Sequence, residues 1–271
     1  MNTNRNPLRK KNMPQRLLIK IGGRAFEQES GFQELAQAIR SLPQTEFGIL
    51  HGGGAEISQA LKNHGRPTRF IDGIRVTQAE DMAIIEKVLS ETVNQRIATW
   101  LSKHGLTCRR MSGKTDQLFL VEPLSSGGLD YGFVGRIKQV NKDGVLAAMQ
   151  SGAVPVISPI SGDENQDSYN VNADSAAAAL AAAIHCTGLI FITDVSGVMD
   201  SDGFCQVLDR QEARKLIESN IIQGGMVAKM NAAFDALAQG VSAAYIIKWE
   251  GVQTLRDLAA GICRSGTILK K

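Results

Sequence analysis

The sequence predicts an α/β fold built on a mainly parallel β-sheet. Short apolar runs, bounded by glycine, proline or acidic residues, recur along the chain, and segments with helical periodicity lie between them. Runs of this kind are typical of buried strands, and a helix between successive strands brings those strands parallel. The 271 residues, of which 43% are hydrophobic and 21% are charged, are enough to bury a substantial core.

The apolar runs and the periodic segments give the elements in chain order. We expect strands at residues 17–21, 47–50, 153–157, 189–193 and 243–247. We expect helices at about residues 31–41, 55–64, 78–103, 142–151, 174–184, 211–219 and 226–239. The segments 66–76 and 106–140 lack a helical period and contain several glycines, so we expect hairpins there that wall a pocket.

The composition gives little support to nucleic-acid or membrane partners. The net charge of +3 arises from a basic segment at residues 1–16, which we expect to be a flexible tail, and the remainder holds slightly fewer bases than acids. No apolar segment follows this tail and no stretch reaches the length of a membrane span, so we expect a cytoplasmic protein. The four cysteines are widely separated and form no C-x-x-C pair, which argues against a zinc site and a disulfide framework.

Glycine or a charged residue follows four of the predicted strands. Gly22-Gly23 follows the first strand, His51-Gly52-Gly53-Gly54 the second, Asp194 the fourth and Lys248 the fifth. In open α/β sheets, ligands bind outside the carboxyl ends of the strands, so these segments are predicted to share one crevice.

Two glycine-rich segments lead directly into predicted helices. His51-Gly52-Gly53-Gly54 precedes the helix at 55–64, so free N–H groups and the helix dipole would face an anion there; the alternative is a tight packing turn. Gly224-Gly225 repeats the arrangement before 226–239. We expect His51 itself to be a hydrogen-bonded structural residue and not a catalytic one.

Two lysines at opposite ends of the chain accompany these glycines. Lys20 ends an apolar run, where a charge is rarely kept without a partner. Lys229 lies near a helix N-terminus, where its charge is unfavourable for the helix, which indicates a negatively charged ligand; the alternative is a solvated surface lysine. Together the lysines and glycines predict phosphoryl transfer.

Asp174 and Arg75 each have two interpretations. Asp174 either caps the helix at 174–184 or lies between the two lysines and fixes their orientation. Arg75 either clamps a substrate carboxylate through two hydrogen bonds or is an exposed hairpin residue.

Gly113-Lys114-Thr115 has the tail of a Walker A loop. The position of the leading glycine of such a loop is Cys108, and residues 117–121 are predicted as a strand and not a helix. We therefore do not expect a P-loop.

Eight motifs in register over nearly the whole chain resemble the amino acid kinase family, and within it the acetylglutamate kinases of arginine biosynthesis. The motifs are Lys20 to Gly23, His51 to Gly54, Gly73 to Thr77, Gly132 to Gly135, Asn170 to Asp174, Thr193 to Val198, Gly225 to Lys229 and Gly266 to Ile268. The resemblance implies a carbamate kinase-like open αβα sandwich of two lobes. The N-lobe, residues 17–182, would bind N-acetyl-L-glutamate and form a homodimer, and the C-lobe, residues 183–271, would bind ATP with Mg²⁺.

The resemblance also implies roles by position. Lys20 and Lys229 would stabilise the transition state, and Asp174 would organise them. The substrate would be bound by Gly53, Gly54, Arg75 and Asn170. The nucleotide would be contacted by Gly22, Gly23, Asp194, Val195, Ser196, Gly197, Val198, Met199, Ile221, Ile222 and Gln223. No side chain would ligate the metal, because phosphates and water would hold Mg²⁺.

The chemistry of the residues agrees with this resemblance. A carboxylate nucleophile has a pKa of about 4.3, so it is ionised at neutral pH and needs no general base. The reaction needs positive charge on the transferred phosphoryl group, which two lysines, helix N-termini and Mg²⁺ can supply.

Some features depart from the family pattern. Arg24 stands where a small or neutral residue is usual, and Glu91 replaces a frequent glycine of the long interlobe helix. Residues 1–16 lack the apolar stripe of the N-terminal helix that links arginine-inhibited relatives into hexamers, so we expect an arginine-insensitive dimer.

Two alternative functions stay open. One is a kinase of the same fold that acts on another acidic amino acid, such as an aminoadipate derivative on a carrier protein. The other is a catalytically silent nucleotide or amino acid sensor, against which intact Lys20, Asp174 and Lys229 argue.

Overall fold

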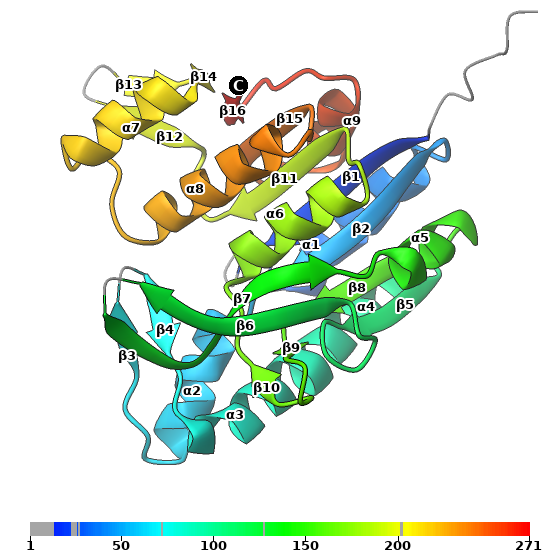
Figure 1. The fold of residues 1–271 in the computed structure, drawn as a ribbon. Coiled ribbons are helices and arrows are strands. Elements are labelled where there is room, and N and C mark those ends of the chain that lie inside the picture. Colours follow the sequence, from blue (N-terminus) through cyan, green and yellow to red (C-terminus); the bar gives the residue numbers. More distant parts are fainter. Residues whose placement is uncertain (1–13, 23–25, 27, 72, 127, 201–202) are drawn as a thin grey trace, which may run out of the picture.

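The structure is a computed structural model that describes residues 14–22, 26, 28–71, 73–126, 128–200 and 203–271. Its centre is an eight-stranded sheet (Figure 1) in which neighbouring strands are parallel except for one antiparallel pair, β15 with β16. The strand order is β14 (Val207–Leu208), β16 (Thr267–Leu269), β15 (Ala243–Lys248), β11 (Gly188–Thr193), β1 (Gln15–Ile21), β2 (Thr45–His51), β8 (Val154–Ser158) and β5 (Cys108–Ser112).

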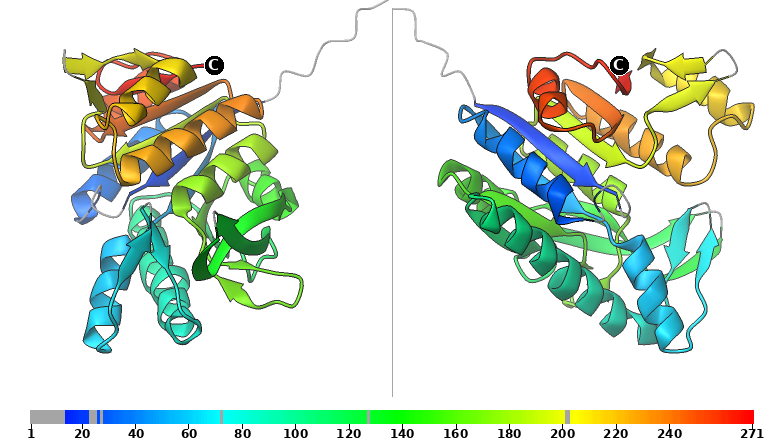
Figure 2. Two further views of the ribbon diagram at one scale, coloured as in Figure 1. Left: turned by 60° about the vertical axis from the view of Figure 1, so that its left-hand side comes forward. Right: turned by 180° about the vertical axis from the view of Figure 1, so that it is seen from behind.

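Helices cover both faces of this sheet (Figure 2) and complete an αβα sandwich. One face packs against α1 (Glu29–Arg40), α4 (Asn94–Lys103) and α9 (Val252–Ala259). The other face packs against α5 (Asp143–Gln150), α6 (Ala173–Ala183) and α8 (Gly225–Ala238). Alternate side chains of β1 point to opposite faces, so Leu17 and Ile19 join one core cluster and Leu18 joins the other.

Three further helices, a second sheet and two hairpins complete the described part of the fold. The helices are α2 (Gly54–Asn63), α3 (Ala79–Glu86), which continues through a π-helical segment (Lys87–Val93) into α4, and α7 (Arg210–Glu218). A four-stranded sheet contains β10 (Ser168–Tyr169), β9 (Ser161–Gly162), β6 (Phe119–Ser126) and β7 (Leu129–Val140). Two hairpins pair β3 (Arg69–Ile71) with β4 (Ile74–Val76) and β12 (Val198–Asp200) with β13 (Gly203–Cys205).

The predicted strands and helices are confirmed within a few residues at each end. The hairpins expected in 66–76 and 106–140 are β3–β4 and β6–β7, but β5 instead pairs with β8 as the edge strand of the main sheet. The sequence Cys-Arg-Arg-Met-Ser of β5 has no apolar run, because an edge strand keeps Arg109 and Arg110 exposed. The short elements β9, β10, β12, β13, β14, β16 and α9 were not predicted.

The first strand begins before the predicted end of the basic tail. β1 includes Gln15 and Arg16, and Arg16 is buried against Glu46 at 2.6 Å, so these two residues belong to the sheet. The predicted absence of an apolar helix was made for residues 1–16, of which 1–13 lie outside the described residues.

Two other features bear on the sequence interpretation. All four cysteines are free, with Cys186 and Cys205 buried and the others half-buried. Lys114 of the Walker-like segment donates to Ser168 Oγ at 2.5 Å and is not at a helix N-terminus.

Among the helices in the described ranges, none has the length and apolar character needed to cross a bilayer.

Candidate active site

A pocket of about 600 Å³ opens at the carboxyl ends of the central strands. Gly22 follows β1, Gly52 follows β2, Pro159 follows β8 and Asp194 follows β11, and all four line it. The pocket therefore lies where the strand ends predicted it.

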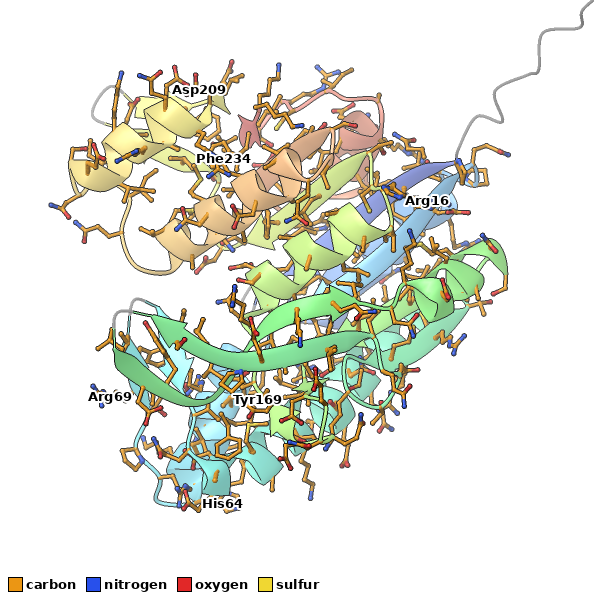
Figure 3. The ribbon with its side chains drawn as sticks, viewed as in Figure 1. Arg16, His64, Arg69, Tyr169, Asp209 and Phe234 are labelled. Atoms are coloured by element: carbon orange, nitrogen blue, oxygen red, sulfur yellow. The ribbon has the colours of Figure 1, made fainter. Side chains whose placement is uncertain are left out.

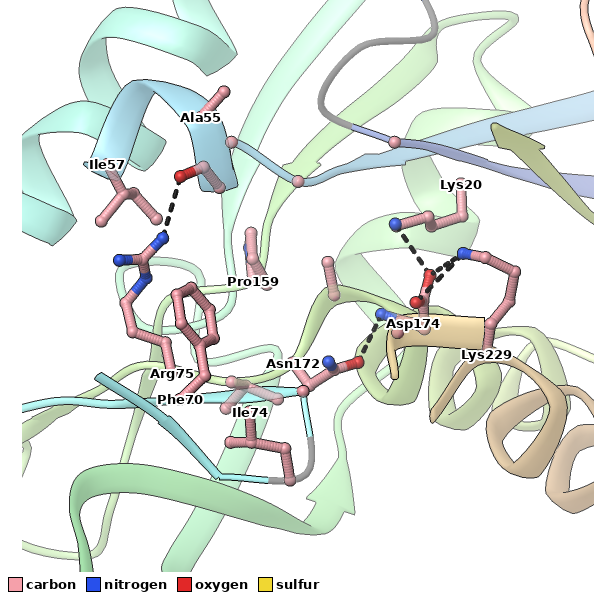
Figure 4. A pocket seen from close by; sticks show the side chains of 18 of the residues that line it. Lys20, Ala55, Ile57, Phe70, Ile74, Arg75, Pro159, Asn172, Asp174 and Lys229 are labelled. Atoms are coloured by element: carbon pink, nitrogen blue, oxygen red, sulfur yellow. Dashed lines mark hydrogen bonds and ion pairs between the residues drawn. The ribbon is translucent and has the colours of Figure 1, made fainter. Parts of the chain in front are cut away.

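Lys20, Asp174 and Lys229 form a buried triad at one end of the pocket. Lys20 Nζ lies 2.8 Å from Asp174 Oδ1, and Lys229 Nζ lies 3.2 Å from both carboxylate oxygens. Each of these residues is only 7% exposed. Figure 4 shows both ammonium groups approaching the same carboxylate from different elements, β1 and α8. The sequence interpretation that places Asp174 between the lysines is confirmed, and that of Lys229 as a solvated surface residue is wrong.

The triad holds two positive charges and one negative charge away from water. Burial acts to raise the pKa of Asp174, but the two ammonium groups outweigh it and hold that pKa below its usual value. Burial lowers the pKa of Lys229, Asp174 opposes this shift, and the neighbouring Lys20 adds to it. The remaining positive charge makes this end of the pocket suited to an anion.

Three helices begin at the pocket. The first residues of α2, α6 and α8 all line it, so the positive ends of three helix dipoles converge there. The N-cap residues of α2 and α8 are Gly53 and Gly224, which bring no side-chain acceptor for the first N–H groups. The first N–H groups of α2 are therefore available to oxygens of a ligand, whereas in α8 the N–H groups of Met226 and Val227 already donate to Gln223 O, at 3.2 Å, and to Gly224 O, at 3.1 Å.

The cap of α6 is Asn172 and not Asp174. The Asn172 side chain accepts from the N–H groups of Asp174, at 2.9 Å, and Ser175, at 3.1 Å. The suggestion that Asp174 caps the helix is thus wrong, because Asp174 lies in the first turn with its carboxylate turned to the lysines. Asn172 satisfies the helix end and leaves Asp174 free to pair with them.

Arg75 occupies the other end of the pocket. Its Nη2 donates to Gly54 O at 2.8 Å and to Ser58 Oγ at 2.9 Å, and the guanidinium lies over the Phe70 ring at 4.7 Å. Burial lowers the pKa of Arg75, which is 8% exposed, so it is not the exposed hairpin residue of the second interpretation. Its Nη1 is buried and has no partner among the described residues. Arg75 lines the pocket, so the positive charge of its guanidinium suits a carboxylate ligand at this end.

The glycine loop joins the two ends. A Cβ on Gly52 would lie 4.0 Å from Lys20 Nζ, and one on Gly54 would lie 4.0 Å from Arg75 Nη2. A Cβ on Gly53 would lie 2.6 Å from Leu89, so this glycine is also required for packing. The packing interpretation of the glycine triplet is thus confirmed for Gly53, and the anion-site interpretation stays a prediction for this loop.

Several other residues that the sequence predicted as contacts of the substrate or the nucleotide also line this pocket. Gly53, Gly54 and Asn170 line the pocket, and Asn170 Nδ2 donates to Thr77 Oγ1 at 3.0 Å. Gly22 also lines it, whereas Gly23 and Arg24 lie outside the described residues.

The segments expected at the nucleotide extend beyond this pocket. Asp194 and Val195 line it, but Ser196, Gly197, Met199, Ile221 and Gln223 do not. The side chains of Val198 and Ile222 are buried in the core, so only their backbone could meet a ligand.

Sequence reasoning did not identify Phe70, Ser58 or Asn172 as site residues. Phe70 pairs with Arg75 across the hairpin and is 54% exposed. The signal available in the sequence was an aromatic residue in the expected hairpin segment, close to Arg75. Ser58 and Asn172 carry no such signal, because their contacts depend on the fold.

No group of three metal-ligating side chains occurs in the ranges that the structure describes. Of the pocket carboxylates, Asp174 is occupied by two lysines, and Asp194 is exposed at the rim. This donor set fits a cation that arrives with a polyphosphate and keeps phosphate and water ligands.

Comparison with known proteins agrees with this geometry. The amino acid kinase family matches residues 15–248. An acetylglutamate kinase of Bacillus velezensis is 36% identical over 241 residues, which are 88% of this chain and 92% of the relative. An acetylglutamate kinase of Geobacillus stearothermophilus is 37% identical over 236 residues, which are 87% of this chain and 90% of the relative.

The fold has close neighbours among solved structures. A crystal structure of a Streptococcus mutans UA159 protein superposes with a TM-score of 0.82 and 26% identity, and covers 95% of this chain and 99% of that one. The family match spans most of the chain, and the identity with the relatives extends over nearly all of it. From these matches and the αβα architecture, the chain belongs to the amino acid kinase family.

Proposed function

We propose that this chain transfers the γ-phosphoryl group of ATP to the side-chain carboxylate of N-acetyl-L-glutamate, the acetylglutamate kinase reaction of arginine biosynthesis. The observation that carries the proposal is the convergence of Lys20 and Lys229 on Asp174 at one end of a pocket whose other end holds Arg75. The curated relatives that match most of the chain carry this activity in their names.

The triad suits the charge changes of phosphoryl transfer. The two ammonium groups lie close enough to share one carboxylate, so they can contact one migrating phosphoryl group and its leaving oxygen. Asp174 keeps both ammonium groups in place before the nucleotide arrives, and the phosphates then add their own negative charge. The acceptor carboxylate is already ionised, so no side chain has to remove a proton.

Arg75 and the glycine loop suit the acceptor. The positive charge of Arg75 can attract an α-carboxylate, while the first N–H groups of α2 face the carboxylate that receives the phosphoryl group. Gly53, Gly54 and Asn170 contribute the nearby wall.

Arg75→Lys is expected to raise the KM for N-acetylglutamate by about tenfold while changing kcat less. A lysine cannot bind a carboxylate through two parallel hydrogen bonds and also hold Gly54 O and Ser58. Steady-state kinetics with each substrate varied would measure this. Equal losses in the KM for ATP would contradict a role at the acceptor.

We place the nucleotide on the side of β11 and α8, with contacts from Asp194 to Met199 and from Ile221 to Gln223. Mg²⁺ would reach the site with ATP and neutralise phosphate charge there. We also assign residues 17–182 to an acceptor lobe and 183–271 to a nucleotide lobe. A cytoplasmic homodimer is part of this proposal, with Glu91 exposed on the π-helical segment.

A hydroxamate assay tests the proposal, because hydroxylamine traps acyl phosphates. With ATP and Mg²⁺, a signal is expected with N-acetylglutamate and little with glutamate or N-acetylaminoadipate. A signal only with aminoadipate compounds would support the kinase of another acidic amino acid. Silence with every acceptor, while ATP still binds, would support a sensor.

The pH dependence of kcat/KM is expected to have an alkaline limb. Because the free protein holds Lys229 with a lowered pKa, this lysine loses its proton at a pH below the usual lysine value, and kcat/KM falls as pH rises through it. In Lys229→Arg the limb should vanish, since a guanidinium stays protonated. If kcat/KM declined at the same alkaline pH in the wild type and in Lys229→Arg, the decline would belong to another titrating group.

A further inference from the structure

His51 closes β2 at the base of the glycine loop and is 1% exposed. Its Nδ1 lies 2.9 Å from the carbonyl oxygen of Gly52, and its Nε2 lies 3.1 Å from Nδ2 of Asn94. Both ring nitrogens are therefore engaged by the protein, and His51 does not line the pocket.

Asn94, the first residue of α4, determines which ring nitrogen carries the proton. Its Oδ1 accepts from Arg110 Nε at 3.0 Å. Its Nδ2 donates to Val156 O at 2.8 Å and lies farther from Met111 O, at 3.4 Å, than from His51 Nε2. These partners fix the orientation of the amide, so the group that faces His51 Nε2 is a donor. Nε2 must then accept, and the single proton of the neutral ring lies on Nδ1, which donates to Gly52 O.

The ring is neutral over the working range of pH. Burial lowers the pKa of His51 to about 4, while the Gly52 carbonyl and Glu56 act in the opposite direction and Arg96 and Lys20 add to the lowering. The tautomer is thus not disturbed near neutral pH.

His51 and Lys20 lie on opposite faces of the sheet. His51 pairs in register with Ile21, and Lys20 pairs with Leu50. Ile21 belongs to the core cluster on the α4 face, whereas Leu50 belongs to the cluster on the α6 face. The Gly52 carbonyl, held by His51, is therefore directed to the α4 face.

The geometry of the trans peptide bond between Gly52 and Gly53 determines where the Gly53 N–H points. No cis peptide occurs in the described residues, and in a trans peptide the N–H points away from the carbonyl. With the Gly52 carbonyl turned to the α4 face, the Gly53 N–H is turned to the opposite face, where Lys20 and the pocket lie.

We propose that His51, held in its Nδ1–H tautomer by Asn94, is a positioning residue that aims the Gly53 amide at the group being phosphorylated. The inference rests on the proposed function, because the Gly53 amide has a hydrogen-bond partner only when an acceptor oxygen or a phosphoryl group is bound in the pocket. The donor would act most strongly on the charge that develops in transfer, so its alignment affects kcat more than KM.

Two substitutions separate positioning from ordinary structural support. In His51→Asn the amide nitrogen takes the place of Nδ1 and can still donate to Gly52 O, but Asn94 loses its acceptor. In His51→Gln the longer side chain reaches the place of Nε2 and can accept from Asn94, but Gly52 O loses its donor. A purely structural role predicts that the glutamine variant is the better one in every respect.

Positioning predicts that activity and stability follow opposite orders. We expect His51→Gln to lower kcat by about 30-fold with a small change in KM, and His51→Asn to stay within about threefold, since one misaligned donor costs less than the hundredfold or more of a lost one. Thermal unfolding should leave the glutamine variant at least as stable as the asparagine variant. Larger loss of kcat in His51→Asn than in His51→Gln would overturn the inference.

His64→Asn is the matched control. Its Nδ1 also lies against a carbonyl, that of Ala60 at 2.8 Å, but it is exposed at the outer end of α2, away from the sheet (Figure 3). Neither kcat nor the melting temperature should change appreciably in this variant.

A spectroscopic measurement does not depend on activity. The sequence has four histidines, and ¹⁵N NMR of the ring nitrogens, assigned by the signals lost in His51→Asn, should show His51 with a protonated Nδ1 and a bare Nε2 from pH 8 to pH 6. A protonated Nε2 would refute the positioning geometry. Wild-type protein that is silent in the hydroxamate assay but has the expected tautomer would refute the proposed function alone.

Discussion

Lys229→Ala is expected to lower kcat by about 1000-fold, or about 4 kcal/mol of transition-state stabilisation, while the KM for N-acetylglutamate changes by only a few-fold. The ammonium group lies 3.2 Å from Asp174 in a buried pocket, where its charge is little screened by water. The charge that it would neutralise develops on the phosphoryl group during transfer and is absent from the acceptor. The loss therefore falls on the chemical step.

Lys62→Ala on the exposed face of α2 is the control, and its kinetics should match the wild type. Removal of the Lys229 ammonium also leaves Asp174 with Lys20 as its remaining partner, so the fold should persist and the melting temperature should change little. Equal increases in KM and decreases in kcat would indicate ordinary binding by Lys229. Full activity of the alanine variant would refute the assignment of the triad to phosphoryl transfer.

The position of the triad could be predicted from the sequence because local patterns determine it. Lys20 is the next-to-last residue of β1, Lys229 lies one turn into α8 after Gly224-Gly225, and Asp174 ends the motif that starts at Asn170 and lies in the first turn of α6. Each therefore lies near an end of an element, on the side of the sheet where the strands have their carboxyl ends. The rule that ligands bind at the carboxyl ends of parallel strands then brings these residues together without knowledge of any long-range contact.

The residues that support the site from outside the triad, Asn172 and Asn94, could not be predicted in that way. Asn172 and Asp174 are both residue types that favour the N-cap position, and they lie two positions apart. In the structure the Asp174 carboxylate pairs with two lysines, and the Asn172 side chain caps the helix. His51 meets Asn94, 43 positions away, through packing of α4 against the sheet. Such contacts depend on how elements pack and leave no periodic signal.

Edge elements were missed for a related reason. β5 has one face toward solvent, so its sequence carries two arginines and no apolar run.

The π-helical segment Lys87–Val93 lies within a helix that periodicity predicted correctly as continuous from 78 to 103. Leu89 of this segment packs against Gly53, a contact that a period of 3.6 residues does not predict.

Asp174→Asn is expected to lower kcat by about 1000-fold and to destabilise the fold by about 3 kcal/mol, the usual cost of leaving a buried charge without its partner. Asparagine keeps the size of the side chain and a hydrogen-bond acceptor but leaves Lys20 and Lys229 to repel each other. The pKa of Lys229 should fall further below its usual value, because the carboxylate that opposes the effect of burial is gone. The alkaline limb of kcat/KM should therefore move to lower pH.

The acid side of the stability profile gives a second measurement. The pKa of Asp174 in the folded protein lies below its ordinary value of 3.8, so the wild type gains stability above about pH 4 and loses it as pH falls through the folded pKa. This component should be absent in Asp174→Asn, whereas Asp143→Asn, exposed in the first turn of α5, should keep it.

Nucleotide affinity distinguishes organisation of the lysines from a direct contribution of Asp174 to ATP binding. Loss of one negative charge makes the pocket more positive, so ATP should bind Asp174→Asn at least as tightly as the wild type, provided that both lysines stay protonated at the pH of the titration. Calorimetric titration near neutral pH measures this directly. Tight binding with a large loss of kcat would mean that the charge of the lysines attracts phosphate without Asp174, but that their alignment for transfer requires it. Weaker ATP binding together with normal turnover at saturation would instead place Asp174 among the nucleotide ligands and contradict its organising role.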